Sequence, residues 1–177
     1  MLGPLDLARK RHASSAPPVL PGGIGSVARL AARPGMAEAL KFFARERRWI
    51  DEQHLAVCRI PAPTFLEQKR AEWMAARLKE LGWETQVDRA GNVVAQAPGA
   101  AKSGPVVALT AHLDTVLAPR PECQILAEKD RFVGPGVADN GAGLAGLLAL
   151  ARVLGQGGHG LDVSRLALVA NVGEEGE

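Results

Sequence analysis

TAHLDT at residues 110–115, GPGVADNGAG at 134–143 and NVGEEGE at 171–177 are the three motifs that decide the fold of this chain. The first overlaps the end of the apolar run 106–110, and the third follows the apolar run 166–170. Short continuous apolar runs between turn residues are typical of central strands that are buried on both faces. In an open α/β sheet, functional side chains gather where such strands end. The motifs therefore predict an α/β fold with polar side chains collected at one edge of the sheet.

Helical periodicity accounts for the segments that precede the motifs. Residues 36–58 place apolar and charged side chains on opposite faces, which predicts an amphipathic helix. A second helix follows a proline-containing break and ends near Leu81, with Thr64 as its N-cap and Glu67 completing a capping box. His54 falls among the polar residues of the first helix, so a solvated histidine is preferred there over a metal ligand.

Three further elements link the helices to the motifs. Residues 84–88 and 92–96 have the composition of two strands joined by a tight turn, which predicts a hairpin. A short strand pair is expected within residues 124–133. Residues 144–154 are almost wholly apolar, so this helix is predicted to be buried in the domain.

Composition and charge narrow the class of protein. Of the 177 residues, 47% are hydrophobic, which indicates a globular fold rather than disorder. The net charge of +2 is too small to indicate a nucleic-acid partner. Five basic residues and one acidic residue give residues 1–35 a charge of +4, so these are predicted to be a disordered basic leader. A surface-binding arm is the less favoured interpretation, and residues 36–177 form the predicted domain.

The same features bear on location. No run of about 18 apolar residues occurs, so no membrane partner is expected. Cys58 and Cys123 lie far apart without a Cys-x-x-Cys spacing, which favours buried or inert thiols. A transit-like leader is one interpretation of the acid-poor start, and a cytoplasmic protein is the simpler one.

His112 and Asp114 lie two positions apart at the end of the first predicted strand. In extended chain, such residues point to the same side. A metal-bound histidine usually donates its other ring N–H to a carboxylate, which fixes the tautomer and strengthens the ligand. A His-x-Asp pair can supply both parts, and it can equally form a structural hydrogen bond. Taken alone, the motif leaves these two interpretations even.

Asp139 precedes the predicted apolar helix, where an aspartate is an ordinary N-cap. Taken alone, this position favours the N-cap interpretation. The glycines on both sides of Asp139 exceed what a cap needs, and glycine allows unusual backbone angles and close approach to a ligand. A carboxylate shared by two metal ions would need such a tight turn.

Glu174 and Glu175 follow the second buried run. Two adjacent carboxylates repel each other unless a cation compensates their charge. One interpretation is a solvated acidic turn, which Glu177 fits. The other divides the work between them: one glutamate binds a metal ion, and the other takes a proton from water and later hands it to a leaving amine.

Together, the three motifs resemble the family of cocatalytic dizinc peptidases and deacylases that includes glutamate carboxypeptidase, aminoacylase, acetylornithine deacetylase, succinyl-diaminopimelate desuccinylase and the tripeptidases. The resemblance covers residues 36–177 and rests on the order and spacing of all three motifs. It implies a three-layer zinc-exopeptidase-like catalytic domain with a mostly parallel mixed central sheet. It also implies an exopeptidase or deacylase that hydrolyses an amide bond in a small peptide or an N-acyl amino acid.

The roles of the family's residues carry over onto the matching positions. By resemblance, His112 binds one zinc ion and Asp114 orients His112. Asp139 bridges both zinc ions and is followed by a cis peptide bond. Glu174 is the general base, and Glu175 binds the other zinc ion. Cobalt or manganese also suits a ligand set of histidine and carboxylates.

The sequence departs from this family after Glu177. Family members continue, supply a further acidic ligand and a late histidine, and insert a smaller domain that dimerises, which implies a homodimeric parent. His12, His54 and His159 are rejected as substitutes for the late histidine. We therefore expect a truncated catalytic domain that is inactive alone and whose intact parent is the enzyme. The alternatives are a non-catalytic remnant or partner-binding fragment, and an enzyme completed by a second chain.

Overall fold

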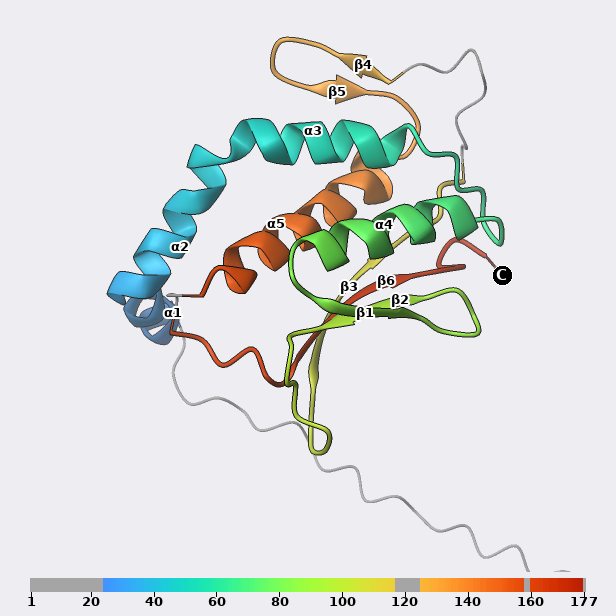
Figure 1. Ribbon diagram of the computed structural model, residues 1–177. Coiled ribbons are helices and arrows are strands. Elements are labelled where there is room, and N and C mark those ends of the chain that lie inside the picture. Colours follow the sequence, from blue (N-terminus) through green and yellow to red (C-terminus); the bar gives the residue numbers. More distant parts are fainter. Residues whose placement is uncertain (1–23, 117–124, 158–159, 177) are drawn as a thin grey trace, which may run out of the picture.

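The computed structural model describes residues 24–116, 125–157 and 160–176, which form an α/β arrangement (Figure 1). A four-stranded mixed sheet lies beneath helices that cover one of its faces, and a separate two-stranded ribbon lies above the helices. The elements in chain order are α1 (Ile24–Ala31), α2 (Pro34–Arg45), α3 (Arg47–Cys58), α4 (Gln68–Glu80), β1 (Glu84–Val87), β2 (Val93–Gln96), β3 (Val107–His112), β4 (Leu126–Ala127), β5 (Phe132–Val133), the kinked turn η1 (Val137–Ala142), α5 (Gly143–Gly155) and β6 (Leu166–Asn171).

The sheet has the strand order β1-β2-β6-β3. β1 and β2 form the predicted hairpin, β2 pairs with β6 in antiparallel fashion, and β3 pairs with β6 in parallel. The register of the parallel pair places His112 opposite Asn171. Because the carboxyl ends of parallel strands share one edge of a sheet, the first and third sequence motifs meet there.

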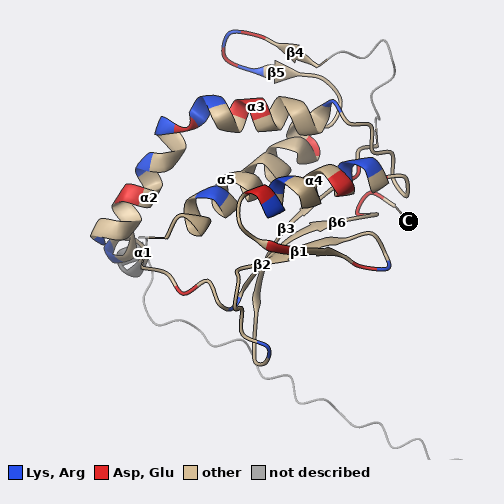
Figure 2. Cartoon of the chain, viewed as in Figure 1, with Lys and Arg blue, Asp and Glu red and all other residues tan. Residues whose placement is uncertain are grey.

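The core lies between the sheet and the helices α4 and α5. α4 packs on β1 and β2, and α5 packs on β3 and β6. Leu148 of α5, Leu168 of β6 and Met74 of α4 are fully buried in this layer. Trp83 donates its indole N–H to the carbonyl oxygen of Ala151 at 3.0 Å. Figure 2 shows that α5 carries little charge, whereas α2 and α3 alternate basic and acidic residues, so the predicted burial of the apolar helix is confirmed.

Val137–Gly155, which combines η1 and α5, is the one stretch of the described residues that is long and apolar enough to cross a membrane. Of this window, 50% is buried inside the fold. The core helix of a globular domain meets the same criteria of length and composition, and the packing of α5 against α3 and β3 accounts for the apolar surface here.

The predicted α/β class with a mixed sheet is confirmed, but details of its layers differ. Only the β3–β6 pair is parallel, so the described sheet is not mostly parallel. The helices that contact the sheet lie on one face, which gives two layers in the described part of the chain rather than the predicted three.

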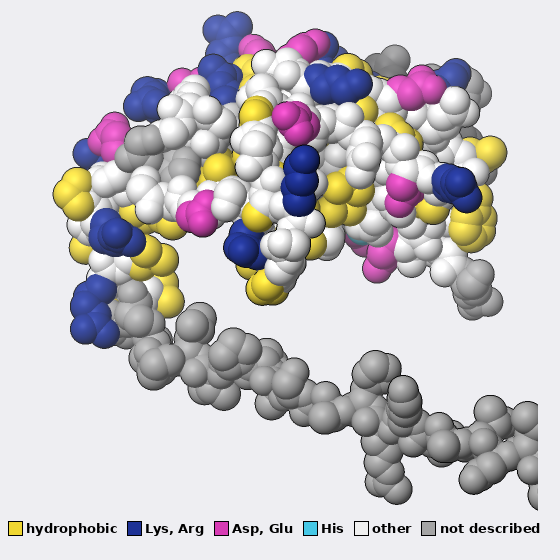
Figure 3. Space-filling model, turned by 60° about the horizontal axis from the view of Figure 1, so that its bottom comes forward, with side chains coloured by type: hydrophobic (Ala, Val, Ile, Leu, Met, Phe, Trp, Pro, Cys, Tyr) yellow, Lys and Arg dark blue, Asp and Glu magenta, His cyan; other side chains and the backbone are white. Residues whose placement is uncertain are grey.

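The position of β3 also differs from the prediction of a central strand. β3 lies at the edge of the described sheet, and Val107 is 63% exposed. Among the residues described, no strand pairs with the other edge of β3, so no neighbouring strand satisfies the backbone N–H and C=O groups on that edge. Figure 3, in which the bottom of the Figure 1 view comes forward, shows hydrophobic side chains between isolated charged groups on the face that is turned to the viewer.

The N-terminal helices differ from the expectation that no fixed structure precedes Met36. α1 and the start of α2 at Pro34 lie within that segment. Proline suits the first position of a helix because its fixed φ is already helical. An N–H group at that position would have no partner within the helix, so nothing is lost by its absence. A break at Glu46 separates α2 from α3, where a single helix is predicted. Residues 1–23 lie outside the described residues, so the basic leader stays a prediction.

Truncation of a core side chain should destabilise the domain far more than truncation of a surface one. We expect Leu148→Ala to lower the free energy of unfolding by about 2–5 kcal/mol, because it removes buried contacts and leaves a cavity. Leu40→Ala on α2, where the side chain is 51% exposed, serves as the control and should change it by less than about 0.5 kcal/mol. Urea unfolding followed by circular dichroism measures both, and equal effects would contradict the assigned core.

Candidate metal centre

Three distant segments of the chain bring His112, Asp139 and Glu175 together. One ligand atom of each residue lies within 4.8 Å of those of the other two. His112 ends β3, Asp139 lies in η1, and Glu175 follows β6. The Nε2 atom of His112 lies 2.8 Å from Oδ1 of Asp139 and 3.9 Å from Oε2 of Glu174. The residues that the sequence predicts for the site, with Asp114 behind His112, therefore lie side by side, and their roles stay predictions.

The His112 ring contacts Asp114 through its Nδ1 atom. The Nδ1 atom lies 3.2 Å from Oδ1 of Asp114 and 3.1 Å from its carbonyl oxygen. Both oxygens are acceptors, so Nδ1 donates to them and Nε2 faces Asp139. Burial works to lower the pKa of His112, but the hydrogen bond to Asp139 and the charge of Asp114 outweigh it, so this pKa is raised above its usual value.

The carboxylate of Asp114 is completely buried and receives donors from three other residues. Oδ1 accepts the backbone N–H of Glu174 at 3.2 Å. Oδ2 accepts the backbone N–H of Glu175 at 2.9 Å and the hydroxyl of Thr64 at 3.2 Å. Burial works to raise the pKa of Asp114, but these donors outweigh it and hold the pKa below its usual value. Asp114 thus ties the first motif to the third.

The turn that carries Asp139 is not a helix cap. The N-cap position of α5 is occupied by Ala142, three residues after Asp139, and no side-chain capping hydrogen bond is made there. The peptide bond between Asp139 and Asn140 is cis, as predicted. Gly136 has a φ of 67°, and a Cβ atom there would lie 2.6 Å from the Thr115 hydroxyl oxygen. The N-cap interpretation is therefore wrong, because the Asp139 carboxylate contacts His112 instead.

α3 supports this turn through two side chains. His54 is predicted to be solvated, but its ring is half-buried and Nε2 donates to the carbonyl oxygen of Val137 at 2.7 Å. The Sγ atom of Cys58 donates to the carbonyl oxygen of Gly136 at 3.7 Å. Cys58 is a free, buried cysteine, so the predicted buried thiol is confirmed at this position, and burial raises its pKa to about 11 against the opposing charge of Arg70. Four residues that the sequence offers as a possible metal ligand, thiol or acidic turn residue lie outside the described residues. They are His12, Cys123, His159 and Glu177.

The start of α4 contributes to the site in a way that sequence reasoning missed. Thr64 and Glu67 are predicted to form a capping box, but α4 begins at Gln68 without a side-chain cap. The Thr64 hydroxyl donates to Asp114, and Glu67 accepts the backbone N–H of Gly173. The spacing of Thr64 and Glu67 in the sequence fits a capping box and the observed contacts equally well. The partners in the observed contacts, Asp114 and Gly173, come from distant parts of the chain. No signal in the local sequence could have separated the two.

The donor set suits a divalent metal ion. Zinc takes histidine nitrogen and carboxylate oxygen at about 2.0–2.2 Å. The His112 side chain is only 8% exposed, yet its Nε2 faces the carboxylates rather than the core. The side chains of Asp139 and Glu174 are 75% and 56% exposed, so the cluster opens to solvent. Three protein ligands with one open side are typical of catalytic rather than structural metal sites.

The lowered pKa of Asp114 predicts a pH-dependent contribution to stability. Because the folded pKa is depressed, the carboxylate stabilises the fold above the ordinary aspartate value of about 3.9. This contribution is lost as the pH falls through the lower folded pKa. We therefore expect Asp114→Asn to be less stable than the parent chain at neutral pH and the difference to shrink in acid.

Urea unfolding over a pH series, with a chelator present, measures this difference. Asp130→Asn, which changes an exposed aspartate, is the control and should follow the pH dependence of the parent chain. A deficit of the Asp114→Asn variant that is the same at every pH would contradict the assignment.

Comparison with known proteins finds similarity to peptidases over part of the chain. Residues 92–176 match the model of peptidase family M28. The cytosol non-specific dipeptidase of Escherichia coli (strain K12) is 29% identical over an alignment that covers 53% of this chain and 22% of that protein. The chain therefore spans about a fifth of the length of this curated relative.

Solved structures of similar fold include two bacterial peptidases and a human one. Aminopeptidase PepT from Bacillus cereus superposes with a TM-score of 0.59 at 22% identity and covers 72% of this chain and 36% of that chain. A tripeptidase from Staphylococcus aureus gives 0.55 at 22% identity, with 71% and 36% covered. Human carnosine dipeptidase 1 gives 0.63 at 12% identity, with 79% and 35% covered. The similarity to peptidases that the three motifs predict is therefore confirmed over part of the chain, whose fold resembles about a third of each of these solved chains.

Proposed function

We propose that residues 36–177 form the N-terminal portion of the catalytic domain of a metal-dependent hydrolase. Its intact parent would cleave an amide bond in a small peptide or an N-acyl amino acid. The observation that carries this proposal is the convergence of His112, Asp139 and Glu175 within 4.8 Å, beside the solvent-facing carboxylate of Glu174. The match to a peptidase family and the dipeptidase relative support a peptide substrate.

In this proposal His112, Asp139 and Glu175 would hold two zinc ions, and Asp139 would be the ligand common to both. Asp114 keeps Nε2 of His112 turned to the site through the contact at Nδ1. A bound zinc ion supplies Lewis-acid polarisation of the scissile carbonyl and lowers the pKa of water. Cobalt or manganese suits the same ligand types. We assign the further ligands of a second ion to parts of the intact parent beyond these motifs.

Glu174 is the general base of the proposed reaction. Its side chain is 56% exposed, and its Oε2 lies 3.9 Å from Nε2 of His112, so the carboxylate reaches the space in front of the imidazole. There it takes a proton from the attacking water as the water oxygen bonds to the amide carbon. When the C–N bond breaks, Glu174 gives this proton to the leaving nitrogen, and an amine and a carboxylic acid are released.

We also propose a cytoplasmic, homodimeric parent. The location is supported by the curated relative, whose name calls it a cytosol enzyme. The homodimer rests on the family resemblance of the motifs. The alternative is a non-catalytic remnant or partner-binding fragment of the same fold, and metal binding separates the two.

Metal titration of the 177-residue chain tests the proposed ligands. We expect calorimetry with zinc to show binding that His112→Ala and Glu175→Gln each weaken by at least about tenfold, because each removes a donor atom from the set. Glu84→Gln changes an exposed glutamate on β1 and should leave the affinity unchanged. Binding that His112→Ala does not alter would contradict the assigned site and favour the non-catalytic remnant.

Glu174→Gln should separate catalysis from metal binding. The amide keeps the size of the side chain but cannot take up a proton at neutral pH. We expect the zinc affinity of the chain to stay within about threefold, since no assigned ligand is lost, and peptide hydrolysis by the intact parent to fall by about 10²–10⁴-fold. Full activity of the variant would rule out Glu174 as the base. A loss of zinc affinity as large as the loss of activity would make Glu174 a metal ligand instead.

A further inference from the structure

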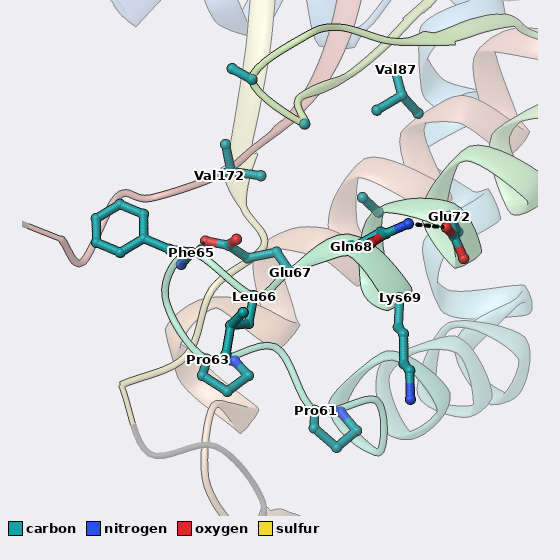
Figure 4. A pocket seen from close by; sticks show the side chains of 13 residues that line it. Pro61, Pro63, Phe65, Leu66, Glu67, Gln68, Lys69, Glu72, Val87 and Val172 are labelled. Atoms are coloured by element: carbon teal, nitrogen blue, oxygen red, sulfur yellow. Dashed lines mark hydrogen bonds between the residues drawn. The ribbon is translucent and has the colours of Figure 1, made fainter.

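Glu67 is a buried carboxylate that the proposed chemistry does not use. It immediately precedes α4 and is only 4% exposed. Its Oε1 atom accepts the backbone N–H of Phe65 at 2.8 Å and that of Gly173 at 3.0 Å. Figure 4 shows the carboxylate turned toward Phe65 and the strand end at Val172, on one wall of an open pocket of about 640 Å³. A side chain just before a helix thus contacts the third motif itself.

The bond to Gly173 completes a continuous pattern along the third motif. Asp114 accepts the next two backbone N–H groups, those of Glu174 and Glu175. Three successive N–H groups are therefore held by two buried carboxylates from outside the loop. Successive N–H groups of this kind form a concavity that binds anions, and Gly173, with a φ of 67°, has the left-handed conformation found in such turns. The loop backbone is fixed, and both glutamate side chains are left to face the site.

Arg70, one turn further along α4, fixes the other motif. This residue is 2% exposed, and its Nη1 donates to the carbonyl oxygen of Leu113 at 2.6 Å and to the hydroxyl of Thr115 at 2.9 Å. These two residues flank Asp114. Nε and Nη2 of Arg70 both donate to the carbonyl oxygen of Ile60, at 3.0 and 2.5 Å. The first turn of α4 therefore contacts the ends of both β3 and β6.

We propose that Glu67 is a positioning residue for the metal centre: it holds Gly173 so that the following carboxylates stay in register with His112. Arg70 holds the end of β3 in the same way. The inference rests on the proposed metal-binding function. Glu67 itself touches neither substrate nor metal and acts only through the loop backbone.

The test compares Glu67→Met with Glu67→Gln in the full 177-residue chain. Methionine keeps the volume but removes both acceptors, whereas the glutamine oxygen can still accept both N–H groups. Glu72→Met is the matched control, because Glu72 lies on the same helix, is exposed and bonds to Gln68 rather than to either motif. If Glu67→Met does not fold, Glu67→Asp, whose carboxylate is one methylene too short to reach, takes its place.

Two measurements are made on each variant. Residue-resolved amide hydrogen exchange without metal should be at least about tenfold faster at Gly173 in Glu67→Met, while the core amides of β6 keep the rates of the parent chain. Cobalt titration should show an affinity at least about tenfold weaker, since groups that orient ligands commonly contribute this much. Glu67→Gln should restore both values to within about threefold, and Glu72→Met should change neither.

Two results would overturn the proposal. If Glu67→Met accelerates exchange throughout β6 by the same factor as at Gly173, Glu67 only stabilises the fold. If exchange at Gly173 rises while cobalt affinity is unchanged, the loop position does not govern the site. Cobalt binding that His112→Ala leaves intact would instead refute the proposed function, and the exchange data would still decide whether Glu67 holds the loop.

Discussion

The buried carboxylate of Asp114 is the interaction on which the rest of the site depends. It accepts hydrogen bonds from the hydroxyl of Thr64 and the N–H groups of Glu174 and Glu175, and it contacts Nδ1 of His112. A buried charge that loses its partners costs about 3–5 kcal/mol, so the end of β3, the end of β6 and the loop before α4 must meet around this group. The contacts that hold these three segments together are therefore also the contacts that assemble the site.

Charge at this edge of the sheet is unbalanced. Carboxylates of Asp139, Glu174 and Glu175 surround one imidazole, and like charges at such distances repel each other unless a cation lies between them. Arg70 is the one lysine or arginine that is buried in the described part of the chain, and it donates to backbone carbonyls behind the site. A divalent cation is the partner that this surplus of negative charge would accept.

Much of the fold could be predicted because the signals for it are local. The hairpin, α5 and β6 follow from periodicity and from the turn residues that bound them, and the cis bond after Asp139 follows from the family resemblance. The capping box failed for a physical reason. A helix cap contributes about 1 kcal/mol, whereas a buried donor or acceptor left without a partner costs about 1–3 kcal/mol. Thr64 and Glu67 therefore serve the motif loops rather than the helix start.

The sequence by itself determined which residues could carry the chemistry, because residue type, strand ends and the two-residue spacing of His112 and Asp114 are properties of short segments. The tertiary structure alone decided that β3 lies at the edge of the described sheet and that His54 supports the turn of Asp139. It also decided that the start of α4 holds both motifs. These features depend on contacts between residues far apart in the chain, and no local pattern specifies the partner of a hydrogen bond that only packing brings within reach.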